Sequence, residues 1–125
     1  MMNTEKEILI IDDDGRNIFA LTAVLKAKKY HCLSALNAVK GLELLEENKN
    51  ISAVLMDMMM PEMDGYEAIG KMKKDDALKN IPVIAITAQA MTGDREKCLE
   101  AGADGYISKP VNVEELLVLL NKLID

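Results

Sequence analysis

Five short apolar runs, separated by longer segments of helical periodicity, constrain the fold of this chain more than any other feature. The runs are nearly continuous rather than alternating, which is typical of parallel strands buried on both faces. Between the runs, apolar residues recur three and four positions apart, as they do on one face of a helix. The runs are residues 8–11, the segment around Cys32 and Leu33, residues 51–56, residues 83–86 and residues 106–107.

This alternation predicts a doubly wound α/β fold, in which five helices cover both faces of one five-stranded parallel sheet. Gly102 suits a helix end that needs a left-handed backbone. Residues whose side chains accept hydrogen bonds from free backbone N–H groups are placed to begin four of the helices, namely Asn37, Asp64, Thr92 and Asn112. We expect residues 1–125 to form a single domain, with no output domain attached.

Composition excludes several classes of function. A chain of 125 residues has room for one compact core. Its net charge of -6 argues against direct nucleic-acid binding, which needs clustered Lys and Arg. No apolar run approaches the roughly 20 residues that span a bilayer, and no secretion signal precedes the first run. We therefore expect a cytoplasmic protein without membrane insertion, in which Cys32 and Cys98 are reduced and buried.

The most informative polar residues stand where the apolar runs end. Asp12 and Asp13 follow the first run, and Asp57 follows the third. Thr87 follows the fourth run, and Lys109 lies just beyond the fifth. Because binding sites in open parallel sheets form at the carboxyl ends of the strands, we expect these side chains to converge. Three neighbouring carboxylates repel one another, and oxygen ligands that leave room for water suit Mg²⁺.

The motifs around these residues resemble those of the response regulator receiver family. They are ILIIDDD at 8–14, MDMMMPEMDG at 56–65, ITA at 86–88 and SKP at 108–110. Their order and spacing cover essentially the whole chain. The resemblance implies a flavodoxin-like sheet with strand order 2-1-3-4-5 and a function in two-component or phosphorelay signalling.

The resemblance also implies a role for each acidic residue. Asp57 would be the phosphoacceptor, taking a phosphoryl group from a histidine kinase or a histidine phosphotransfer protein. Asp12 and Asp13 would hold Mg²⁺, or alternatively Mn²⁺, together with Asp57 and the backbone carbonyl of Met59. The protein would signal to a downstream protein target and catalyse only its own phosphorylation and dephosphorylation.

Further positions match the switch of the family. Thr87 would donate its hydroxyl to the phosphoryl group, and Lys109 would pair with that group and with Asp57. Tyr106 matches an aromatic residue that rotates toward the switch threonine. Pro110 resembles a proline that follows a cis peptide bond and aims Lys109 into the site.

Three further positions near the site are expected to tune the rate of dephosphorylation or access to the site. Met59 and Gln89 occupy the two positions that set the lifetime of the aspartyl phosphate in the family. Because Met59 cannot hydrogen-bond an attacking water, we expect slow self-dephosphorylation. Ala88 would leave the site open to partner and water. The phosphodonor is expected to dock on residues 16–19 and on the loop at Pro110.

Two other classes of function compete with this interpretation. A haloacid-dehalogenase-like phosphatase would use Asp12 as its nucleophile and Asp14 as its acid or base. That reading needs a further acidic motif after Lys109 and leaves Asp57 unexplained. A receiver-like interaction module that never accepts phosphate would lack part of the acidic site or the lysine, and this sequence retains both.

Overall fold

The computed structural model describes residues 6–88 and 93–124. Within these residues, five parallel strands form one sheet in the order β2-β1-β3-β4-β5, as the family resemblance predicts. The elements are, in chain order, β1 (Glu7–Ile11), α1 (Gly15–Ala27), β2 (His31–Ala35), α2 (Ala38–Glu47), β3 (Ile51–Asp57), α3 (Gly65–Lys74), β4 (Val83–Thr87), α4 (Asp94–Ala101), β5 (Gly105–Ser108) and α5 (Val113–Ile124).

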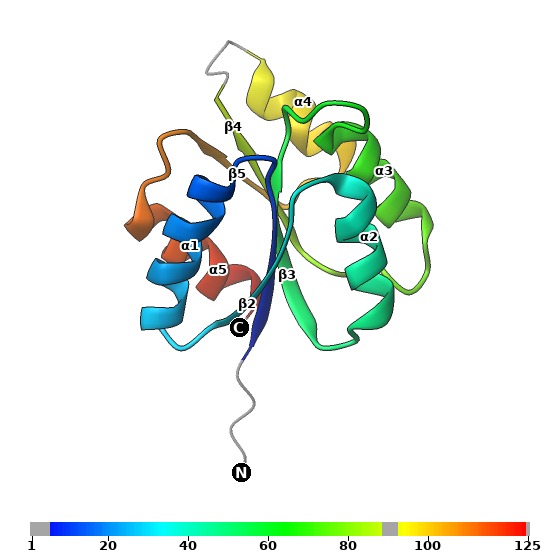
Figure 1. The fold of residues 1–125 in the computed structure, drawn as a ribbon. Helices are drawn as coiled ribbons and strands as arrows, with labels where there is room; N and C mark the ends of the chain where they lie inside the picture. The colour runs from blue at the N-terminus through cyan, green and yellow to red at the C-terminus, as the bar shows by residue number, and fades with distance from the viewer. Residues whose placement is uncertain (1–5, 89–92, 125) are drawn as a thin grey trace.

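The helices cover the two faces of the sheet, with α1 and α5 on one face and α2, α3 and α4 on the other (Figure 1). Alternate residues of each strand point to opposite faces, so the strands supply two separate apolar cores. Leu21 and Leu25 of α1 and Leu116 of α5 pack into one core. Ile69 and Met72 of α3 pack into the other.

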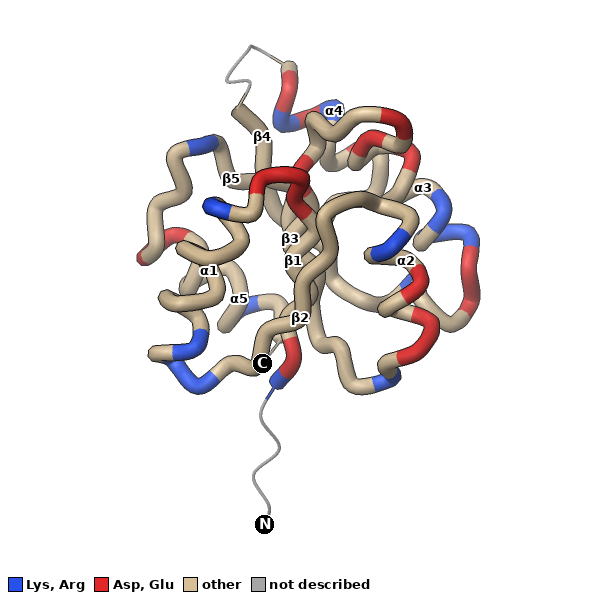
Figure 2. Tube along the Cα trace, in the orientation of Figure 1, with Lys and Arg blue, Asp and Glu red and all other residues tan. Residues whose placement is uncertain are grey.

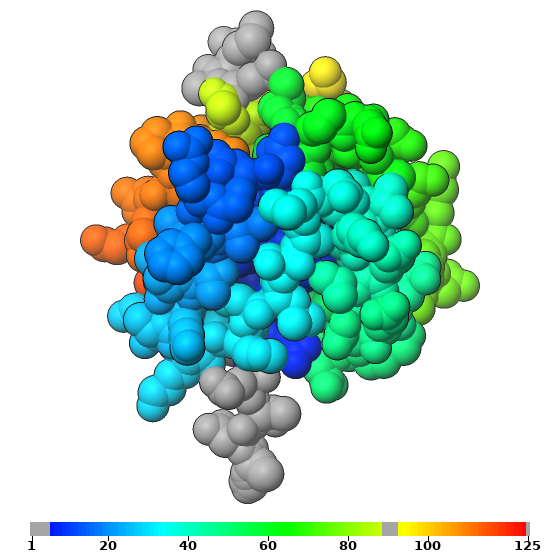
Figure 3. All heavy atoms as spheres, viewed as in Figure 1, coloured from blue at the N-terminus to red at the C-terminus, as the bar shows by residue number. Residues whose placement is uncertain are grey.

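The central strands are buried as the continuous apolar runs predict. Every residue of β4 is buried, and so are all residues of β3 except one. β2 lies at the edge of the sheet and is more exposed. Figure 3 shows this edge, with α1 in blue on one side and α2 in cyan to green on the other. The two-sided burial leaves the ends of the strands as the places where polar groups can gather.

Most of the predicted helix caps are confirmed. Asn37, Asp64 and Asn112 each accept a hydrogen bond from the backbone N–H three residues later, at 2.9, 3.0 and 2.9 Å. Gly102 ends α4 with a φ of 119°, in the left-handed region that favours glycine. The structure therefore confirms these boundaries to within a residue or two.

The predicted start of α4 at Thr92 is wrong by one residue. Thr92 itself lies outside the described residues, and the N-cap of α4 is Gly93, whose φ of 90° is left-handed. Gly93 has no side chain with which to cap the helix. Its left-handed backbone at the start of α4 uses the conformational freedom of glycine.

Two expectations from composition can be compared with the structure. None of the helices in residues 6–88 and 93–124 is long and apolar enough to cross a bilayer. Cys32 and Cys98 are both free, as expected, although only Cys98 is fully buried.

Candidate functional site

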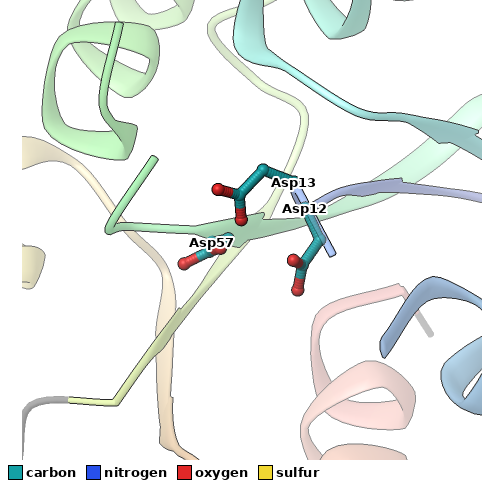
Figure 4. Close-up of side chains that lie close together, drawn as sticks. All are labelled: Asp12, Asp13 and Asp57. Atoms are coloured by element: carbon teal, nitrogen blue, oxygen red, sulfur yellow. The ribbon is translucent and has the colours of Figure 1, made fainter. Parts of the chain in front are cut away.

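The three acids singled out in the sequence lie together at the carboxyl ends of β1 and β3 (Figure 4). One carboxylate oxygen from each of Asp12, Asp13 and Asp57 lies within 4.8 Å of the others. We call these three residues the acidic cluster. Asp12 and Asp57 are buried, with 2% and 4% of their surface exposed, whereas Asp13 is exposed. The convergence predicted from the ends of the apolar runs is therefore present.

Strand pairing brings the acidic cluster together. In the parallel register of β1 and β3, Ile11 lies opposite Met56, so the residues that follow, Asp12 and Asp57, are neighbours. The sheet continues past these partners, because the Asp12 N–H donates to the Ala35 carbonyl at 3.1 Å. Asp12 and Asp57 thus lie on neighbouring hydrogen-bonded strands of the sheet.

Backbone N–H groups fix the orientation of both buried carboxylates. Oδ1 of Asp12 accepts a hydrogen bond from the Asp14 N–H at 2.8 Å. Oδ1 of Asp57 accepts one from the Met59 N–H at 3.0 Å. Asp14 itself points away to cap α1, accepting from the Arg16 N–H at 2.9 Å. Each buried acid therefore keeps its other oxygen, Oδ2, directed toward the remaining charges of the site.

The loop after Asp57 is packed so closely that it requires a glycine. A Cβ added to Gly65 would lie 2.5 Å from the Met58 sulfur and 2.8 Å from the Met58 Cα. It would also lie 3.0 Å from the Asp57 carbonyl oxygen. The first turn of α3 therefore rests directly on the backbone that carries Asp57.

Lys109 supplies positive charge to the cluster. Its Nζ lies 3.6 Å from Oδ2 of Asp12 and 3.8 Å from Oδ2 of Asp57. The Lys109 N–H donates to the Thr87 carbonyl at 2.8 Å, which ties the end of β5 to the end of β4. The peptide bond between Lys109 and Pro110 is cis, as the family resemblance predicts.

Among the described residues, the site carries an excess of negative charge, because its three carboxylates face one ammonium group, that of Lys109. The pKa of Asp57 is raised to about 6, with burial as the largest cause. The negative charges of Asp12 and Asp13 also raise the pKa of Asp57. The hydrogen bond from the Met59 N–H and the positive charge of Lys109 lower this pKa. Figure 2 shows the acidic segment after β1 at this end of the sheet.

The acidic cluster fits a hard divalent cation. It offers carboxylate oxygens as ligands. Lys109 balances one of its three negative charges, so two remain for the cation. Two oxygens bound to one Mg²⁺ lie about 3 to 4 Å apart, because Mg–O distances are about 2.1 Å. The present separations of up to 4.8 Å are close to that range, so small side-chain rotations suffice. The exposed position of Asp13 leaves one side open to water, which Mg²⁺ retains.

The remaining predicted residues lie in or beside the strands β3, β4 and β5, with one exception outside the described residues. Thr87 is 1% exposed at the end of β4, and Ala88 after it is exposed. The Met59 side chain is 49% exposed, so only its backbone reaches the cluster. Tyr106 lies in β5, one strand away from Thr87. Gln89 lies outside the described residues.

Sequence reasoning missed a buried acid close to the site. Asp94, the first residue of α4, is 6% exposed and accepts hydrogen bonds from the hydroxyls of Tyr66 and Tyr106. An aspartate at the start of a helix is usually a cap, so the sequence carries no signal for this second role.

A largely apolar cavity of about 490 Å³ opens beside the acidic cluster. Asp12 and Lys109 form its polar end, and Pro110 lines the wall formed by the loop between β5 and α5. The opposite wall is formed by α1 through Ala20, Leu21 and Val24. Phe19 precedes Ala20 and is 77% exposed outside the cavity lining. This cavity lies where the sequence predicts the phosphodonor to dock.

Comparison with known proteins now identifies the family. The family model of the response regulator receiver domain matches residues 8–121. The chain belongs to this family. The receiver is 36% identical to the polar-differentiation response regulator DivK of Brucella anthropi over 112 residues, which cover 90% of each protein. DivK of Brucella ovis is 34% identical with the same coverage.

Solved structures agree with this assignment. A putative response regulator from Chloroflexus aurantiacus matches with a TM-score of 0.91 and 26% identity, covering 97% of this chain and 98% of the other. The receiver domain of a sensor histidine kinase from Pseudomonas aeruginosa matches with a TM-score of 0.87 and 32% identity, with the same coverage. That structure has a magnesium ion coordinated in its active-site cleft.

The phosphatase alternative is not supported. The family match assigns the chain to the receivers of two-component signalling. The geometry also explains Asp57, which that alternative left without a role, because its carboxylate joins Asp12 and Asp13 in one cluster.

Proposed function

We propose that this receiver accepts a phosphoryl group on Asp57 from the phosphohistidine of a histidine kinase or a histidine phosphotransfer protein. The observation that carries the proposal is the buried Asp57 carboxylate, with Asp12 and Asp13 within 4.8 Å and Lys109 Nζ 3.8 Å from its Oδ2. Membership of the family and the likeness to DivK support it.

Asp57 acts as the nucleophile in its ionised form. One carboxylate oxygen forms a bond to phosphorus while the N–P bond of the phosphohistidine breaks, and the imidazole leaves with the electron pair. The Met59 N–H holds Oδ1 and so fixes the rotation of the carboxylate. Lys109 lies close enough to Oδ2 to neutralise a phosphoryl oxygen bound there.

Asp12, Asp13, Asp57 and the backbone carbonyl of Met59 are the groups that would hold Mg²⁺, or Mn²⁺ in its place. The bound ion would neutralise charge on the acids and on the phosphoryl oxygens. The acidic cluster of this chain supports the assignment, and so does the magnesium ion in the receiver domain from Pseudomonas aeruginosa. Asp12 and Asp57 supply preoriented oxygens, because backbone N–H groups already hold both side chains.

Switching is proposed to run through Thr87 and Tyr106. The Thr87 hydroxyl would bind the phosphoryl group, and Tyr106 would turn toward the space that Thr87 leaves, so that a downstream protein target is recognised. Thr87 and Tyr106 lie on adjacent strands, which supports this coupling. Met59 gives slow self-dephosphorylation because its thioether does not orient water, and Ala88 and Gln89 are the other two positions proposed to tune the reaction.

The phosphodonor is proposed to dock at the cavity between α1 and the loop at Pro110. Exposed Phe19 and the apolar cavity wall offer surface for a partner helix, and Asp12 and Lys109 lie at the polar end next to Asp57. We propose a cytoplasmic protein as the phosphodonor, and docking at this surface involves neither nucleic acid nor membrane.

Phosphorylation with acetyl phosphate tests the proposal directly. We expect wild type to gain the mass of one phosphoryl group in the presence of Mg²⁺ and to lose this labelling when the metal is chelated. Asp57→Asn should remain unlabelled, whereas Glu46→Gln, a charge-matched change on exposed α2, should be labelled like wild type. Labelling of Asp57→Asn at the wild-type rate would overturn the proposal.

A further inference from the structure

α4 buries one carboxylate and one thiol against the rest of the receiver, instead of an apolar stripe. Its two buried residues are Asp94 and Cys98, which lie one helical turn apart on the same side. The other helices, such as α5 with Leu116 and Leu120, follow the usual pattern of an apolar face packed on the sheet. The position of α4 therefore depends on what Asp94 and Cys98 contact.

Asp94 joins three elements through one carboxylate. Its Oδ1 accepts a hydrogen bond from the hydroxyl of Tyr66 in α3 at 3.1 Å, and its Oδ2 accepts one from Tyr106 in β5 at 2.9 Å. The Tyr66 hydroxyl also lies 3.7 Å from the Cys98 sulfur. Figure 1 shows α3 beside α4, the two helices that Tyr66 connects. Both carboxylate oxygens of Asp94 therefore accept from tyrosine hydroxyls.

The two hydrogen bonds from the tyrosine hydroxyls to Asp94 are expected to be stronger than hydrogen bonds between neutral groups. A buried carboxylate that accepts from two neutral donors makes charge-assisted bonds, which are worth more than bonds between neutral groups. Burial and the bond to Asp94 raise the pKa of Tyr106 to about 12, so its hydroxyl remains a donor at neutral pH. Lys97 Nζ lies 5.2 Å from the centre of the Tyr66 ring and adds a cation–π contact.

The sheet register connects Asp94 with the proposed switch. Ala85 lies opposite Tyr106, and Thr87 lies opposite Ser108. Residues two apart in a strand point to the same face, so the Tyr106 and Thr87 side chains lie on the same face of the sheet. A change of the Tyr106 rotamer by about 120° carries its hydroxyl several Å away from its present position. Such a movement breaks the bond to Asp94.

We propose that Asp94 is a latch that holds α4 in its unphosphorylated position through its bonds to Tyr66 and Tyr106. Phosphorylation of Asp57 releases the Tyr106 bond and leaves the Tyr66 bond in place, so α4 loosens on one side. Asp94 is thus a positioning residue for the switch. This inference rests on the proposed function, because it needs Tyr106 to move when Asp57 is phosphorylated.

Hydrogen exchange of the α4 amides tests the latch, with beryllium fluoride and Mg²⁺ as a mimic of the phosphoryl group. In the free protein, we expect Asp94→Asn, Tyr66→Phe and Tyr106→Phe each to speed α4 exchange about ten- to hundredfold, the effect of losing one buried bond to a charged group. Exchange in α1 and α5 should stay unchanged. Tyr30→Phe, which removes a tyrosine hydroxyl on the opposite face of the sheet, is the matched control.

Addition of beryllium fluoride separates the roles of the two tyrosines. It should speed α4 exchange in wild type and in Tyr66→Phe, but not in Tyr106→Phe, which has already lost the bond that is released. If wild type binds no beryllium fluoride, the proposed function is overturned, and the latch falls with it. If beryllium fluoride binds normally while α4 exchange in Tyr106→Phe equals wild type with and without it, the latch alone is overturned.

Discussion

Replacing Asp57 by Asn is expected to make the metal-free receiver more stable at neutral and alkaline pH. The pKa of the wild-type Asp57 carboxyl is raised from 3.8 to about 6. Burial is the main cause, and the negative charges of Asp12 and Asp13 add to it. Asn has nearly the same shape and can still accept the hydrogen bond from the Met59 N–H. It carries no charge, so the repulsion from Asp12 and Asp13 is removed.

The size of the effect follows from the change in pKa. A rise from 3.8 to about 6 corresponds to about 3 kcal/mol between the two protonation states. Between these two values the folded state holds a proton that the unfolded state has lost, so wild-type stability falls as pH rises. The gain from Asp57→Asn should be about 3 kcal/mol at most near pH 8 and about half of that near pH 5. It should nearly vanish near pH 3.

Urea unfolding of both proteins across this pH range, in the presence of a chelator, measures the difference in the free energy of unfolding. Mg²⁺ should narrow the difference at pH 8, because it stabilises wild type, which offers one more anionic ligand. Glu46→Gln, on exposed α2, controls for the loss of a negative charge elsewhere. An Asp57→Asn protein that is no more stable than wild type at pH 8, or a gain that does not depend on pH, would refute the electrostatic argument.

Three further predictions concern the neighbours of Asp57. Lys109→Met should abolish labelling by acetyl phosphate while leaving far-UV circular dichroism unchanged, because the ammonium that faces Asp57 is lost; normal labelling would contradict its role. Met59→Asn should speed the decay of phosphorylated Asp57, measured by intact mass over time, and an unchanged half-life would refute the role of Met59 in lifetime. Gly65→Ala should destabilise the protein by about 1 to 3 kcal/mol in urea unfolding, because its Cβ would collide with Met58; an unchanged midpoint would show that the loop adapts.

The sequence predicts the fold almost completely because its signals are local and agree with one another. The buried runs, the caps at Asn37, Asp64 and Asn112, and the left-handed glycine at 102 each depend on residues close in the chain. Their agreement leaves one architecture, and the family resemblance supplies the strand order. The start of α4 is the exception, because the sequence favours Thr92 by its hydroxyl, whereas the N-cap is Gly93 in a left-handed conformation.

The site was predictable where strands position it and unpredictable where helices pack on one another. Asp12 and Asp57 follow adjacent parallel strands, so the topology alone brings them together. The bonds from Tyr66 and Tyr106 to Asp94 depend on how α4 lies against α3 and β5, which no local pattern encodes. The raised pKa of Asp57 likewise depends on burial, which sequence spacing does not quantify.

The residues of the acidic cluster come from two segments that are far apart in the chain, which links metal binding to folding. Asp12 and Asp57 become neighbours only after β1 and β3, which are far apart in the chain, have paired along their whole length. A divalent ion that requires all three acids would therefore bind only chains that have completed this non-local pairing. Binding of that kind stabilises the folded state relative to the unfolded chain. Added Mg²⁺ would accordingly raise the free energy of unfolding by an amount that grows with its concentration.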